Sequence, residues 1–219
     1  MAFALVNSGV VDGTSLTIPA ATAGNLLAAF VTQNGATLPG NPPTLAGWAT
    51  SGSYATTTAS TGVFLLTKTA AGGETTIAPT AGTGGTIDAI SYFEISGYPG
   101  TLYLDGSPIT ASNISSATTY TSAPVTTVVA GSILLMCSTT GTNQDGGQLA
   151  WAASNLAVPV LVGASGTNLK QTSASYIPGV TLSGVTFTAS WTTSRVSGFL
   201  LFAISPTLPP ASGIPPAFL

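Results

Sequence analysis

Six acids and three cations are the side chains of this sequence that could carry acid, base or ionic chemistry. They are Asp12, Glu74, Asp88, Glu94, Asp105 and Asp145, with Lys68, Lys170 and Arg195. The sequence has no histidine, which excludes Ser-His-Asp and Cys-His nucleophiles. Neither lysine stands in a Ser-x-x-Lys pattern, so the serine–lysine variant has no local signature either.

Asp88 and Glu94 are the two acids that stand nearest each other in the sequence. Both belong to a segment with strand character, where six residues span about 20 Å. Glycoside hydrolysis needs two carboxylates roughly 5–9.5 Å apart. A second acid would have to come from another strand, and few others exist. The sequence therefore predicts a protein that is not an enzyme and that needs no cofactor, with an enzyme as a distant alternative.

Metal and thiol chemistry have little support. Zinc sites need cysteine or histidine, and the one cysteine, Cys137, stands in an apolar run typical of a buried strand. Asp145, in Asn143-Gln-Asp-Gly-Gly147, is the one acid in a loop that could bind calcium, but a plain turn is the favoured interpretation. We expect no metal site.

Three tryptophans, Trp48, Trp151 and Trp191, have two interpretations. They could pack at the starts or edges of strands, or they could form a platform on which sugar rings stack. Trp48 and Trp151 hold similar places in two similar parts of the chain, which favours packing.

The overall charge is low. Charged residues make up 4% of the chain, against about 25% in an average soluble domain. Three cations cannot form a basic patch, so we expect no nucleic-acid partner and no anionic membrane surface. No segment has the features of a signal peptide or the roughly 18–20 apolar residues of a membrane helix. Weak charge repulsion favours a protein that assembles with copies of itself.

The elements that position these residues are strands. Residues 87–97 are rich in β-branched and aromatic types and end at a glycine. The end of this segment, Tyr92-Phe-Glu-Ile-Ser96, recurs as Leu201-Phe-Ala-Ile-Ser205, and Ala23-Gly-Asn-Leu-Leu27 recurs as Ala130-Gly-Ser-Ile-Leu134. The offset is about 107 residues for Ala23–Leu27, 103 for Trp48 and Trp151, and 109 for Tyr92–Ser96. Such similar offsets indicate two related halves.

We therefore predict an all-β fold, a jelly-roll-like antiparallel β-sandwich built from two related halves. Residues 1–205 form the sandwich, with halves at about 1–97 and 124–205 and a connecting excursion at 98–123. Two separate sandwiches of about 95 residues are the alternative.

Residues 206–219 are expected to form an extended arm in polyproline conformation, because prolines cannot pair within a central strand. We expect this arm to lie on its own domain or on a neighbouring subunit. The candidate interface residues are Pro206, Pro209, Pro210, Pro215, Pro216, Phe218 and Leu219.

The segments around Ala23–Leu27, Gly47-Trp48, Leu65–Thr75 and Ile87–Gly97 resemble a jelly-roll domain of tailed-bacteriophage virion proteins. The resemblance implies a capsid decoration (cement) protein, located on the virion surface after assembly in the host cytoplasm. It implies a homotrimer bound to the major capsid protein, and it brings no catalytic residues. The alternative is a tail-fibre or tail-tip module that binds a receptor, such as a host surface glycan.

Overall fold

The computed structural model describes residues 2–35, 41–56, 61–139, 148–154, 160–162 and 171–209. Within these residues every regular element is a β-strand, so the all-β fold is confirmed. The strands are β1 (Ala4–Asp12), β2 (Leu16–Thr17), β3 (Leu26–Gly35), β4 (Ala49–Thr56), β5 (Thr61–Thr69), β6 (Thr76–Ile77), β7 (Gly85–Ser96), β8 (Tyr103–Leu104), β9 (Ile109–Thr121), β10 (Ile133–Thr139), β11 (Gln148–Ala153), β12 (Val160–Val162), β13 (Gln171–Tyr176) and β14 (Phe187–Ser205).

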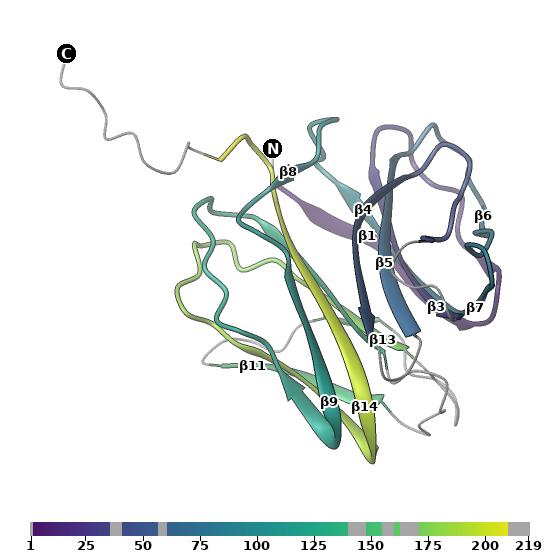
Figure 1. Cartoon of the computed structure of the whole chain (residues 1–219). Coiled ribbons are helices and arrows are strands. Elements are labelled where there is room, and N and C mark those ends of the chain that lie inside the picture. Colours follow the sequence, from purple (N-terminus) through teal and green to yellow (C-terminus); the bar gives the residue numbers. More distant parts are fainter. Residues whose placement is uncertain are drawn as a thin grey trace.

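Two large antiparallel sheets form the molecule (Figure 1). The first has the order β1-β7-β3-β5-β4. The second contains β11-β14-β10-β13-β12, and β8 and β9 also pair with β14. β9 and β14 run side by side as a long ribbon, teal and yellow-green in Figure 1. All the strands of each sheet come from one continuous part of the chain, so we call residues 2–97 the first half and 98–205 the second half.

The same strand order is present in both halves. The order β1-β7-β3-β5-β4 of the first sheet corresponds to β9-β14-β10-β13-β12 in the second. The register agrees as well, since Leu26 lies opposite Ile95 and Ile133 lies opposite Ile204. These pairs fall within the two sequence echoes, so the repeat seen in the sequence corresponds to a repeat in three dimensions.

The two sheets pack face to face through one apolar core. Along β3 and β10 alternate side chains enter this core, because successive residues of a strand point to opposite faces. The core residues are Phe3, Leu26, Ala28, Phe30, Val63, Leu65, Phe93 and Ile95 from the first half, with Ile133, Leu135, Cys137, Leu200, Phe202 and Ile204 from the second. Gly52 of β4 is needed here, since a Cβ at this position would lie 2.0 Å from Cζ of Phe202.

The packing of the sheets is pseudo-symmetric. β7 contacts β13 and β14 contacts β5, which are corresponding pairs. In the same way β1 contacts β12 and β4 contacts β9. The contacts of β14 with β4 and of β10 with β5 have no counterpart of similar extent, so the two halves meet with approximate twofold symmetry only.

Short pairs of segments cover the outer face of each sheet. In the first half, β2 and β6 pair through Leu16 and Ile77 and pack over Val31 and Ile90. In the second half, an isolated bridge between Val125 and Val185 takes this position. Because both faces of the central strands are covered, β3 and β10 are buried on both sides.

Three expectations need comment. The antiparallel sandwich is confirmed, whereas the strand orders do not establish a jelly-roll connectivity, since each half builds its own sheet. The second half does not begin near Pro124. Residues 98–123, expected as a connecting excursion, contain β8 and β9, and both pair with β14. β9 is rich in serine and threonine and lacks the apolar alternation from which strands were expected.

Candidate functional site

Glu94 on β7 is the most deeply buried acid of the first half, with no exposed surface. Its carboxylate accepts hydrogen bonds from Asn7 Nδ2 (2.9 Å), Asn25 Nδ2 (2.7 Å) and the backbone N–H of Thr22 (2.8 Å). Burial by itself raises the pKa of Glu94, but these hydrogen bonds outweigh it and hold the pKa below its ordinary value. Glu94 is thus an ionised structural group that fixes the turn before β3.

Asp105 plays the corresponding part in the second half. It is 3% exposed and accepts the N–H groups of Val128 (2.9 Å) and Val129 (3.0 Å) and the hydroxyl of Ser132 (2.6 Å). These donors belong to the turn before β10, which corresponds to the turn before β3. Gly24 and Gly131 occupy the matching positive-φ positions in these turns, at +84° and +79°.

The two carboxylates come from different places in the chain. In the aligned registers, the residue of β14 that corresponds to Glu94 is Ala203, which has no polar side chain. Asp105 lies beside it, because the Asp105 N–H donates to the Ala203 carbonyl at 2.8 Å. In the second half the charged group therefore comes from the β8–β9 turn, whereas in the first half it comes from β7.

Glu74 and Lys68 form a third ionic group, nearer the surface. Lys68 Nζ lies 2.8 Å from Glu74 Oε1, and the backbone N–H groups of Ala71 and Gly72 also donate to this carboxylate. The Lys68 hydrogen bond, followed by that of Ala71, lowers the pKa of Glu74 to about 2. The pair closes the tight turn between β5 and β6 and leaves the Lys68 ammonium paired.

A buried polar cluster joins the two sheets. Gln171 of β13 accepts from Thr32 Oγ1 at 2.5 Å and donates to Ser91 Oγ at 2.6 Å. Ser91 in turn lies 2.5 Å from Ser173 Oγ. All four side chains are buried, so the cluster fixes the register of one sheet on the other.

The two tryptophan side chains that the structure describes, Trp48 and Trp191, pack against other residues. Trp191 is 3% exposed and donates to the Ala117 carbonyl at 2.7 Å. Trp48 is half-buried against Leu27 and the outer cluster of the first half. Trp151 lies on β11, which pairs with β14, whereas the strand that corresponds to β4 is β12. Trp48, which immediately precedes β4, and Trp151 are therefore not equivalent, because similar spacing placed them at strands with different partners.

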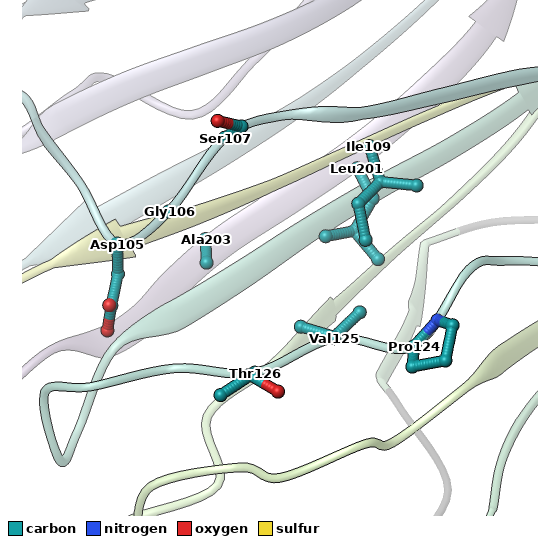
Figure 2. Close-up of a pocket in the computed structure, with 9 residues that line it drawn as sticks. All are labelled: Asp105, Gly106, Ser107, Ile109, Pro124, Val125, Thr126, Leu201 and Ala203. Atoms are coloured by element: carbon teal, nitrogen blue, oxygen red, sulfur yellow. The ribbon is translucent and has the colours of Figure 1, made fainter.

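A surface cavity of about 250 Å³ opens next to Asp105 in the second half (Figure 2). Its apolar wall is formed by Ile109, Pro124, Val125, Leu201 and Ala203, and its polar part by Asp105, Gly106, Ser107 and Thr126. Figure 2 shows Leu201 and Ile109 at one end and Asp105 at the other, with the Ala203 side chain between them.

A second and more open cavity, of about 320 Å³, lies beside the edge strand β4. Its lining combines the hydroxyl groups of Ser51, Thr67 and Thr69 with the Tyr98 ring and Lys68. Burial raises the pKa of the Tyr98 phenol, although its hydrogen bond to Thr69 acts in the opposite direction.

The remaining candidates are placed as follows. Cys137 is fully buried in the inter-sheet core, where burial raises the pKa of its thiol. Asp88 is buried at the β7 bulge opposite Thr32 and Gln33. Asp145 and Lys170 lie outside the described residues, and so do Pro210, Pro215, Pro216, Phe218 and Leu219. Among the residues that the structure does describe, no three acids, cysteines or histidines gather as a metal site would require.

Sequence reasoning missed the donors that surround Glu94 and Asp105, because they come from distant strands and loops. Asn25 and Ser132 stand at the same place in the echoed segments, which was the one signal available. Of the arm, the structure describes Pro206 to Pro209, where Pro206 is half-buried and Leu208 is 71% exposed.

Comparison with known proteins gives no family: no family model, curated protein or solved structure matches the chain. No helix among the described residues is long and apolar enough to cross a membrane.

Proposed function

We propose that the chain is a non-enzymatic structural protein of a tailed-bacteriophage virion, a decoration protein that binds the head surface as a homotrimer. In this role it stabilises the lattice of the major capsid protein. The resemblance of its strand segments to virion jelly-roll domains supports the class of protein.

The observation that carries the proposal is that these ionic groups bind other parts of the same chain. Glu94 and Asp105 hold the turns before β3 and β10, and Glu74 and Lys68 hold each other. These groups are engaged in maintaining the sandwich. The surface that remains is rich in threonine, serine, glycine and alanine, so it can be buried against another protein with little cost of charge desolvation.

The two-sheet sandwich suits such a structural role. Both central strands are buried on both faces, and the two halves share one continuous core. A rigid body of this kind keeps its contact surfaces in place when copies assemble around it.

Adding the purified chain to virions from which it has been removed tests the proposal. We expect the protein to rebind the heads and to restore their resistance to heat. A chain lacking residues 206–219 should bind less and protect less. Virions whose heat resistance does not depend on the protein would contradict the decoration role.

The cavity beside Tyr98 favours one alternative, a tail-fibre or tail-tip module that binds a host glycan. Hydroxyl groups next to an aromatic ring, as Ser51, Thr67 and Tyr98 provide here, are suited to recognise a sugar. Binding on a glycan array that is lost in Tyr98→Ala would support this alternative, and a protein that binds no glycan would remove it.

A further inference from the structure

The cavity beside β4 lies at a corner of the first sheet that differs from the same corner of the second sheet. The aligned registers place Lys68 and Thr69 of β5 where β13 and the residue after it have Tyr176 and Ile177. Tyr176 and Ile177 pack against apolar clusters, whereas Lys68 and Thr69 line the open cavity. The sandwich therefore does not need polar residues at this corner, which points to a role for them beyond packing.

Two pairs of hydroxyl groups line this cavity. Ser51 Oγ lies 2.6 Å from Thr67 Oγ1, and Thr69 forms a hydrogen bond with the Tyr98 phenol. A pair of hydroxyl groups uses one proton in its own hydrogen bond, so each pair keeps one O–H group to donate and oxygen lone pairs that accept. A ligand with donors and acceptors on neighbouring atoms matches such pairs, and the adjacent hydroxyl groups of a sugar ring are of this kind.

Tyr98 and Leu102 supply an apolar wall of the same cavity. Both side chains also pack against the inter-sheet core, which holds them in place. Ala49 of β4 completes this wall. The C–H groups of a sugar ring can pack against aromatic and aliphatic side chains while its hydroxyl groups bind polar ones, so one ring can use both kinds of lining.

Lys68 is the one charged residue among those that line the cavity. Its ammonium is paired with Glu74 at 2.8 Å, and the N–H groups of Ala71 and Gly72 hold the same carboxylate. An acidic sugar would compete with Glu74 for Lys68, and a basic sugar would meet the ammonium with no carboxylate in the lining. The charges therefore favour a neutral ligand.

The size of the cavity limits the ligand to one ring. Its volume of about 320 Å³ stands at the lower end of the range of small-molecule sites, about 300–1,000 Å³. A single sugar residue suits this space, and further residues of a glycan would extend from the opening into solvent.

We propose that the cavity formed by Ser51, Thr67, Thr69, Tyr98 and Leu102 binds one neutral pyranose residue, free or at the end of a glycan. The ring packs on Tyr98 and Leu102, and its hydroxyl groups exchange hydrogen bonds with the Ser51–Thr67 pair. The inference goes beyond the decoration role, and it gives the class of sugar for the tail-module alternative.

Ligand-observed NMR and isothermal titration calorimetry on the full chain test the inference. The probes are the methyl glycosides of glucose, galactose, mannose and N-acetylglucosamine. We expect at least one to bind with a Kd of about 1 mM, as suits a ligand of about a dozen heavy atoms. The uronate and the amino sugar that correspond to it should bind at least about ten-fold more weakly, because each brings a charge without a free partner.

Two variants locate the binding. Ala49→Phe places a ring in the cavity from an exposed position of β4 and should weaken binding at least about ten-fold. Thr69→Val keeps the shape of the side chain without its hydroxyl group and should weaken binding about five-fold. Ser107→Phe is the matched control, because it adds the same ring at the exposed rim of the cavity beside Asp105 and should leave binding unchanged.

Three results would overturn the inference. They are no binding of any of these glycosides, equal binding in wild type and Ala49→Phe, and tighter binding of a charged counterpart. If Ala49→Phe does not fold, unchanged binding in Thr69→Val overturns the inference in its place. None of these outcomes depends on virions, so a failure here removes the tail-module alternative and is distinct from a failure of the decoration role.

Discussion

Glu94 and Asp105 hold corresponding turns of the two halves, Glu94 through the Thr22 N–H at 2.8 Å and Asp105 through the Val129 N–H at 3.0 Å. The two residues do not correspond in sequence, since Ala203 takes the place of Glu94. Both halves therefore hold this turn with a buried carboxylate. Glu94 supplies it from β7, and Asp105 supplies it from the β8–β9 turn.

Replacing Glu94 with glutamine should destabilise the protein strongly. The neutral amide keeps the shape but turns one acceptor into a donor, which faces Asn7 or Asn25. Hydrogen bonds to charged groups contribute about 1.5–3 kcal/mol, so we expect a loss of about 3 kcal/mol in urea unfolding. Glu74→Gln, at the more exposed ion pair, is the control and should cost at most about 1 kcal/mol. Equal losses in both variants would contradict the account.

The pH dependence of stability follows from the same carboxylates. The pKa values of Glu94 and Glu74 are lowered in the folded protein, the latter from 4.5 to about 2. A lowered pKa contributes stability above the unfolded value that is lost as the pH falls through the folded value. The free energy of unfolding should therefore fall from about pH 4.5 downward. Chemical unfolding at a series of pH values measures it, and Glu94→Gln should make the profile less steep while the contribution of Glu74 remains.

Tyr92→Phe should leave the protein as stable as before or more stable. The Tyr92 ring is 1% exposed, and its hydroxyl has no hydrogen-bond partner among the described residues. Burial, with the Glu94 charge second, raises the pKa of this phenol to about 12. Removing an unsatisfied hydroxyl contributes up to about 1 kcal/mol. Tyr92→Leu, which copies Leu201, should instead cost about 2 kcal/mol through the cavity it leaves. Thermal unfolding of both variants measures these changes in stability. A marked loss of stability in Tyr92→Phe would show that the hydroxyl has a partner.

Gln171→Leu should weaken the junction between the sheets. It leaves the Thr32 hydroxyl buried without its acceptor and removes the donor to Ser91, at a cost of about 2 kcal/mol. The quadruple variant Gln171→Leu, Thr32→Val, Ser91→Ala, Ser173→Ala should recover much of this loss, because all four polar side chains of the cluster are then removed together. Ser138→Ala is the control, since the Ser138 hydroxyl has no partner in the described structure. A quadruple variant less stable than the single one would contradict the expected coupling.

The sequence echoes were enough to predict an antiparallel sandwich of two related halves. Leu26, Ile133 and Ile204 stand in apolar runs typical of buried strands, so local pattern and repeat agree there. The site was harder to predict. Asp105 becomes structural only because β8 brings it beside Ala203, and β9 becomes a strand only because β14 offers an edge. Such pairings depend on contacts between distant residues, which no local pattern reports.

The position of the protein on purified virions tests the proposed function most directly. Electron cryo-microscopy, with quantitative mass spectrometry, gives its location and its copy number relative to the major capsid protein. The decoration role predicts density on the outer head surface in groups of three and a copy number comparable to that of the major capsid protein. A few copies confined to the tail, or absence from the particle, would contradict it.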